Sequence, residues 1–139
     1  MRKVKLLFVA LIVASMAFSG CKKYEEGPSL SLRSKTTRIT GEWKMAKKQF
    51  NGVTVDINAD EKTTIHVINK DGSLILKTQY GNNTGTWQFS DDKTRYISKT
   101  EMLGHITTKN EEIIRLTNKE LILEEIKDGD KTRTEFEKL

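Results

Sequence analysis

Two histidines are the side chains in this sequence best suited to acid–base or metal chemistry. His66 and His105 are the only ones, and neither has a second metal ligand at a recognised spacing. His66 stands between Ile65 and Val67, so the alternation of a β-strand predicts that it faces solvent, opposite two core residues. A serine nucleophile would need one of these histidines and an acid brought to it by the fold, and the sequence has no nucleophile-elbow pattern. We therefore expect neither a metal centre nor a catalytic triad.

Acidic residues occur as the adjacent pairs Glu111-Glu112 and Glu124-Glu125. Neighbours on a strand point to opposite faces, which is the wrong arrangement for two carboxylates that must flank one bond. Asp128-Gly129-Asp130 lacks the third ligand and the closing glutamate of a calcium loop, and we predict a turn there. No glycine-rich phosphate loop is present. These patterns predict a protein that is not an enzyme and that uses no cofactor.

Length and charge limit the domain count and the partners. The chain has 139 residues, enough for one domain, and a formal net charge of +5. Arg2, Lys3 and Lys5 lie in a segment that we expect to be removed, and without them 21 basic residues face 19 acidic ones. A net charge of +2 with mixed signs is not the basic stripe of a nucleic-acid binder. With a single cysteine, no disulfide can form within the chain.

The first 20 residues have the pattern of a secretory signal peptide. A positively charged start is followed by the apolar or small residues Leu6–Ala17 and then by Phe18-Ser19-Gly20, before Cys21. The apolar run is too short to cross ~30 Å of hydrocarbon comfortably as a helix. It also lacks the amphipathic period that would favour a buried helix. We therefore predict a signal peptide over residues 1–20.

The residues Phe18-Ser19-Gly20-Cys21 resemble the lipobox of bacterial lipoproteins, with phenylalanine where leucine is usual. The resemblance implies a diacylglycerol thioether on Cys21 and a further acyl chain on its amine, which would hold the protein on a membrane because each buried CH₂ contributes ~0.8 kcal/mol. Lys22 stands where inner-membrane retention signals have aspartate, which favours the outer membrane. The periplasmic and cell-surface faces both stay open. Residues 21–39, which include the only proline, Pro28, are predicted to be the lipidated cysteine and a flexible tether.

From residue 40 onward, apolar and polar residues alternate between turn signals, as in consecutive β-hairpins. Residues 58–62 and 81–84 are predicted to be loops. We predict an all-β fold, an antiparallel up-and-down meander of about eight strands that closes into a small barrel over residues 40–139, because closure removes exposed edges. The expected strands are Gly41–Phe50, Val53–Ile57, Thr63–Asn69, Leu74–Tyr80, Gly85–Ser90, Arg95–Leu103, Ile113–Leu116, Leu121–Ile126 and Lys131–Leu139, and a further strand at His105–Lys109 stays open.

Two Gly-x-Trp elements, Gly41-Glu42-Trp43 and Gly85-Thr86-Trp87, open expected strands. Between them lies the turn Lys70-Asp71-Gly72, and a late hairpin runs from Ile113 to Leu121. The order and spacing of these motifs resemble the lipocalin-like domains of Bacteroidota lipoproteins, which are small calycin-like barrels. The resemblance covers residue 39 to the C-terminus. It implies a lipid-anchored envelope protein with a lipocalin-like domain.

The same resemblance implies structural roles for Gly41, Trp43, Gly85 and Trp87. In the lipocalin-like proteins, the tryptophan of the first strand packs against an arginine late in the chain and plugs the barrel floor. Arg133, or as second choice Arg115, would supply that arginine here through a cation–π contact with Trp43.

An eight-stranded barrel is either filled by its side chains or encloses one small ligand. Because only about 100 residues bury the core, packing is expected to use most of the inward set. The expected inward residues are Trp43, Met45, Ile65, Val67, Leu74, Leu76, Trp87, Phe89, Leu116, Leu121, Leu123 and Phe136.

Three functions stay open at this point. The first is a lipid-anchored module that binds a small hydrophobic ligand or lipid, with the membrane as partner through acylated Cys21. The second is a ligand-free barrel that acts as a structural or protein-interaction accessory of the cell envelope. The third is an envelope hydrolase that would use one of the two histidines, His66 or His105. The size of the barrel interior distinguishes the first two.

Overall fold

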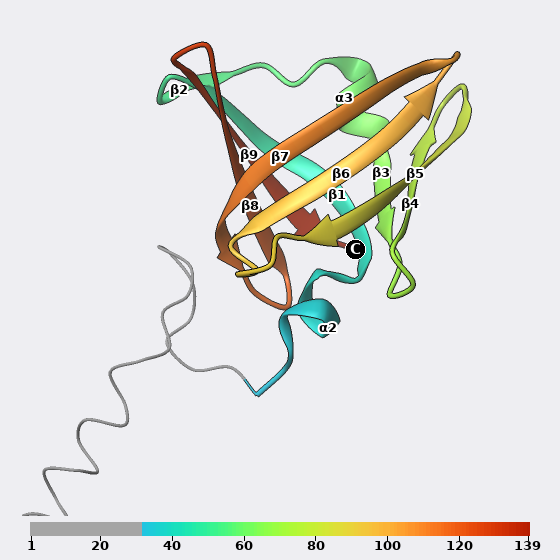
Figure 1. Cartoon of the computed structure of the whole chain (residues 1–139). Helices are drawn as coiled ribbons and strands as arrows, with labels where there is room; N and C mark the ends of the chain where they lie inside the picture. The colour runs from blue at the N-terminus through green and yellow to red at the C-terminus, as the bar shows by residue number, and fades with distance from the viewer. Residues whose placement is uncertain (1–31) are drawn as a thin grey trace, which may run out of the picture.

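A computed structural model describes residues 32–139 and shows a closed antiparallel β-barrel of eight strands, with one extra strand at its rim (Figure 1). The predicted all-β meander is thereby confirmed. The predicted signal peptide, Cys21 and the first part of the predicted tether lie outside the described residues. The elements are α2 (Lys35–Ile39), β1 (Gly41–Phe50), β2 (Val53–Val55), α3 (Ala59–Thr63), β3 (Ile65–Ile68), β4 (Ser73–Thr78), β5 (Gly81–Phe89), β6 (Arg95–Met102), β7 (His105–Leu116), β8 (Glu120–Lys127) and β9 (Asp130–Lys138).

Strand β1 closes the barrel. Its first half pairs with β3 and its second half with the short β2, while its other edge pairs with β9 along most of its length. From β3 to β9 each strand pairs with the next one along the chain. The sheet is therefore continuous around the barrel, and β2 is the added strand beside the second half of β1.

Because successive strands run in opposite directions, the connections gather at two ends. We call the end that carries α2 the floor, where the chain also turns between β3 and β4, β5 and β6, and β7 and β8. The opposite end, which we call the mouth, carries α3 and the hairpins β1–β2, β4–β5, β6–β7 and β8–β9. In Figure 1 the floor lies below and the mouth above.

The folded part begins earlier than predicted. Residues 35–39 were assigned to the flexible tether, but they form α2, whose first turn is capped by the Ser34 side chain accepting from the Thr37 amide at 3.1 Å. Ile39 is completely buried, and Arg38 Nη1 donates to the Leu116 carbonyl at 2.8 Å. These contacts attach α2 to the barrel floor.

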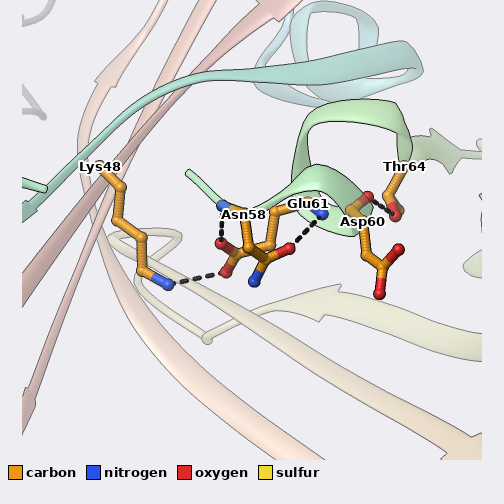
Figure 2. Close-up of polar contacts among 5 residues, drawn as sticks. All are labelled: Lys48, Asn58, Asp60, Glu61 and Thr64. Carbon is orange, nitrogen blue, oxygen red and sulfur yellow. Dashed lines mark hydrogen bonds and ion pairs between the residues drawn. The ribbon is translucent and has the colours of Figure 1, made fainter. Parts of the chain in front are cut away.

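The predicted loop at residues 58–62 is also helical. Asn58 and Glu61 form a capping box around the start of α3, in which each side chain accepts from the backbone amide of the other residue (Figure 2). The Thr64 hydroxyl donates to the Asp60 carbonyl at 2.7 Å at the other end. The Asn-x-x-Glu spacing was the sequence signal for this turn of helix.

Two strands are longer than predicted. Residues 81–84, predicted to be a loop, belong to β5, and the turn lies one step earlier, where the Thr78 hydroxyl donates to the Gly81 carbonyl at 2.8 Å. The expected strands His105–Lys109 and Ile113–Leu116 form the single strand β7, which has an irregularity between Ile113 and Arg115.

Candidate functional site

Strand β3 faces the opposite way to the prediction. His66 lies opposite Trp43 on β1 and Leu76 on β4, which both point into the barrel, so His66 points inward with them. Ile65 and Val67 were predicted to be inward, and they are half-buried on the outer side. Both faces of β3 are apolar enough for a core, so pairing with β1 and β4 decides its orientation. His105 lies at the exposed end of the β6–β7 hairpin, so the fold does not bring the two histidines together.

A cavity of about 100 Å³ lies inside the barrel above the floor. At ~30 Å³ per water, it has room for about three waters or one compact molecule, whereas pockets for drug-sized ligands span ~300–1,000 Å³. Its wall near the floor is apolar and its wall toward the mouth is mostly polar. The apolar lining residues are Trp43, Met45, Ile68, Leu74, Leu76, Leu121, Leu123 and Phe136, and the polar lining residues are His66, Tyr96, Ser98, Thr100, Lys109, Glu111 and Thr134.

Four of the polar side chains at the cavity are at least nine-tenths buried. Tyr96 is 5% exposed, Ser98 7%, Glu111 8% and Thr134 7%. Within residues 32–139, none of these four side chains forms a hydrogen bond or ion pair with another protein group. Their polar atoms are not among the fully buried, unpartnered side-chain atoms of the described residues, so these atoms are accessible from the cavity and are expected to bond its contents. None of these four residues was predicted from the sequence to belong to a site.

The electrostatic environment sets the protonation of these groups. Burial, reinforced by the charge of Lys109, lowers the pKa of His66 to about 4, so its ring is neutral near pH 7. Burial raises the pKa of Glu111, with Glu125 raising it further and Lys109 opposing the change. Burial and the neighbouring Glu111 raise the pKa of Tyr96. The cavity therefore offers a neutral imidazole, a phenol and one buried carboxyl.

Helix α3 lies at the mouth and is attached to the barrel through its acidic residues. Glu61 pairs with Lys48 of β1 at 2.7 Å, and Gln79 of the β4–β5 hairpin donates to Asp60 (Figure 2 shows the first pair). Burial alone would raise the pKa of Glu61, but the Lys48 and Asn58 hydrogen bonds and the charges of Lys48 and Lys109 hold it below its ordinary value. The contact with Lys48 thereby holds Glu61 and the start of α3 against β1 at the mouth.

The floor is built around Trp43, which is completely buried. Its indole Nε1 donates to the Ile39 carbonyl at 2.6 Å, and Lys138 Nζ lies 5.0 Å from the ring centre. Gly41, with φ +134°, leaves room for this lysine, because a Cβ there would come 2.5 Å from Lys138 Cε. The tryptophan thus occupies the floor, and a lysine supplies the cation.

The predicted cation–π partners of Trp43 lie elsewhere. Arg133 pairs with Gln49 in the half of β1 nearer the mouth, and its neighbour in sequence, Thr134, is the residue that faces the cavity. Arg115, the second choice, pairs with Glu120 at 2.9 Å on the outer surface. Lys138 lies opposite Trp43 in the β1–β9 pairing, which no sequence pattern in the last strand could reveal.

Gly85 and Trp87 lie on the inner face of β5. A Cβ at Gly85 would overlap the carbonyl oxygen of Lys99 on β6, so glycine permits the close approach of these two strands. Trp87 Nε1 donates to the Asn69 carbonyl at 2.7 Å, and its ring stacks on Tyr96 at 6.1 Å between centres. Trp87 thereby packs against Tyr96, which lines the cavity.

Within residues 32–139, no group of three or more histidine, cysteine, aspartate or glutamate residues is placed to hold a metal ion. Of the helices in the same part of the chain, none has the length and apolar character needed to cross a membrane. No protein-family model and no curated protein matches the sequence.

Proposed function

We propose that this chain is a lipid-anchored lipoprotein of the bacterial outer membrane whose lipocalin-like barrel binds a compact small molecule. The observation that carries the binding proposal is the cavity, where buried Tyr96, Ser98, Glu111 and Thr134 have no hydrogen-bond partner within the described protein. Polar groups kept inside a barrel without partners are typical of binding sites, since a purely structural interior would be cheaper to fill with apolar residues.

The cavity favours a smaller and more polar ligand than the hydrophobic molecule or lipid expected from the sequence. Its volume of about 100 Å³ is well below the ~300 Å³ at which pockets for larger ligands begin. The apolar side near Trp43 and Phe136 suits a short hydrocarbon portion, while the side near Ser98 and Glu111 suits a polar head. A compact amphipathic molecule matches both sides.

Native mass spectrometry of the full chain, purified in mild detergent, tests the binding proposal. We expect a bound species of low mass that dissociates on gentle activation. Repeated absence of such a species, together with failure of compact molecules to raise the melting temperature, would count against ligand binding.

Membrane attachment has an independent test. The proposed anchor, Cys21, rests on its position after Phe18-Ser19-Gly20 in the sequence. Cys21→Ala should abolish metabolic labelling with palmitate and leave the precursor unprocessed, while Cys21 in the unaltered chain is labelled. Labelling that persists in the variant would refute this assignment.

A second function, docking to a protein of the envelope, is favoured by the mouth. Most large apolar side chains exposed in residues 32–139 lie on its hairpins, including Leu103 at 94% exposure and Tyr80 at 82%. Leu103→Asp should then weaken a partner cross-link formed from the mouth and leave cavity binding intact. The exposed apolar residues at the mouth are Phe50, Val53, Tyr80, Met102, Leu103, Ile106 and Ile126.

A further inference from the structure

We propose that the barrel cavity selects a small organic cation, with the Glu111 carboxylate as its counter-ion. This inference rests on the proposed small-molecule function, which by itself requires only that the ligand be compact. It adds the charge of the ligand and the residue that recognises it.

Glu111 differs from three carboxylates that are paired with a lysine, those of Glu61, Glu42 and Glu124. Glu61 pairs with Lys48 at 2.7 Å, Glu42 with Lys77 at 2.7 Å, and Glu124 with Lys131 at 2.9 Å. These three pairs lie nearer to solvent. Glu111 is only 8% exposed and faces the cavity, yet no cation within residues 32–139 pairs with it. A buried charge without a partner is costly, so its partner is expected to come from outside the protein.

The charges around Glu111 leave a negative excess inside the barrel. Lys109 lies two residues away on the same face of β7, one step nearer the mouth, while Glu125 of β8 adds a second negative charge. His66 of β3, across the barrel, is neutral because its pKa is about 4.

Two further titratable groups bear on this charge balance, Tyr96 at the cavity and Glu61 at the mouth. Tyr96, opposite Glu111 on β6, stays protonated because its pKa is raised, and Glu61 of α3 is already neutralised by Lys48. Among the described residues, Glu111 and the nearby Glu125 therefore stand against Lys109, which has no ion pair there, and the surplus negative charge favours a cation over an anion.

The geometry of the walls also suits an ammonium group. A primary ammonium has three donors, and the neighbouring acceptors are the Glu111 carboxylate and the hydroxyl oxygens of Tyr96 and Ser98. Its short alkyl portion would lie against Phe136 and Leu74 on the apolar side. An anion of the same size would meet only Lys109 and would bring its charge close to Glu111.

The test compares three probes of matched size on the full chain in detergent: n-butylammonium, 1-butanol and butyrate. Isothermal titration near neutral pH should show n-butylammonium binding at least about tenfold more tightly than 1-butanol, and butyrate binding least. Glu111→Gln should reduce n-butylammonium affinity at least about tenfold. Glu112→Gln is the matched control, because Glu112 is the next residue on β7 but is exposed on the outer face.

The pH dependence gives a second readout that needs no variant. Affinity of the unaltered chain for n-butylammonium should fall as the pH is lowered through the raised pKa of Glu111, because protonation removes the counter-ion. Equal binding of n-butylammonium and 1-butanol, or unchanged affinity in Glu111→Gln, would overturn the cation assignment and leave a compact-ligand function standing. Preferential binding of butyrate would do the same. Failure of all three probes would overturn the cation assignment, and native mass spectrometry would decide the wider function separately.

Discussion

The two ends of the barrel use buried polar groups in opposite ways. At the floor, Trp43 Nε1 donates to Ile39, Arg38 Nη1 to Leu116, and Lys138 Nζ to the Arg38 carbonyl at 2.9 Å. These three donors find acceptors in the protein itself, although Arg38 Nε, which is also buried, has none among the described residues. Toward the mouth, the buried side chains of Ser98 and Glu111 find none among the described residues. The difference indicates that the floor holds the fold together, while the upper interior is kept available for something else.

Truncation at the floor should have the largest effect on stability. Trp43→Ala removes a completely buried indole and should lower the free energy of unfolding by about 3–5 kcal/mol, measured by urea denaturation. Trp43→Phe should cost less, because it keeps an aromatic ring and loses chiefly the hydrogen bond to Ile39. Leu103→Ala at the mouth, where the side chain is 94% exposed, should change stability by less than about 0.5 kcal/mol. Equal losses of stability in Trp43→Ala and Leu103→Ala would contradict the conclusion that the floor holds the fold together.

Acid should weaken the barrel through the upper interior. The folded-state pKa of His66, about 4, lies below its ordinary value of 6.5. The contribution of the neutral ring to the free energy of unfolding is therefore complete above pH 6.5 and is lost as the pH falls toward 4. The loss should reach about 3 kcal/mol in that window. Urea denaturation across the window should show it, and His66→Phe should remove this part of the pH dependence.

Glu111 changes stability with pH in the opposite sense, because its raised pKa means that protonation of the carboxyl favours the folded state. The effect of His66→Phe on the pH dependence of stability should therefore be measured in a Glu111→Gln background. Unaltered pH dependence in His66→Phe would show that the ring is not held neutral by burial.

Glu111→Gln itself should stabilise the unliganded protein, by about 1 kcal/mol near neutral pH, because it removes a buried charge that lacks a protein partner. Thermal or urea unfolding measures the gain, and Glu112→Gln on the exposed face should give no such gain. Stabilisation combined with weaker binding is the trade-off expected of a binding residue. A destabilised Glu111→Gln variant would instead indicate a structural role for the carboxylate.

The smallest effect on the free energy of unfolding is expected from breaking the attachment of α3. Lys48→Met breaks the partly exposed pair with Glu61 and should cost no more than about 1 kcal/mol. Hydrogen exchange of residues 59–63 should nevertheless accelerate, because the mouth helix loses one of its two side-chain attachments to the barrel. Lys77→Met breaks the equally short pair with Glu42 on the barrel surface and should leave α3 unaffected. Equal acceleration in both variants would argue against a specific attachment.

The barrel was predictable because its turns and alternation are local signals. The Asn51-Gly52 turn and the Gly41-Glu42-Trp43 element place strand boundaries from neighbouring residues alone, whereas β5 begins at Gly81, before the second Gly-x-Trp element. The face that β3 turns inward was not predictable, since Ile65 and Val67 on one side and Ile68 on the other are all apolar, and pairing with β1 decides between them. The Lys138 contact with Trp43 likewise depends on the register of two strands far apart in sequence.

The cavity was missed for a related reason. On β7 both faces are polar, with Lys109 and Glu111 on one and Asn110 and Glu112 on the other, so composition does not tell which face is inside. Only barrel closure buries Glu111 and leaves Glu112 exposed. The capping box at Asn58 and Glu61, by contrast, is a local signal that the sequence contained, and helix α3 was predictable from it.

The most direct measurement is a high-resolution crystal structure of the full chain that shows what fills the upper interior. We expect ordered density, from water or a compact ligand, within hydrogen-bond distance of the Glu111 carboxylate and the Ser98 hydroxyl. Soaking with n-butylammonium should replace that density with the amine, its nitrogen next to Glu111. An empty or collapsed interior, with Glu111 bonded to Tyr96, Ser98 or another protein group, would contradict the claim that these residues are kept for a ligand.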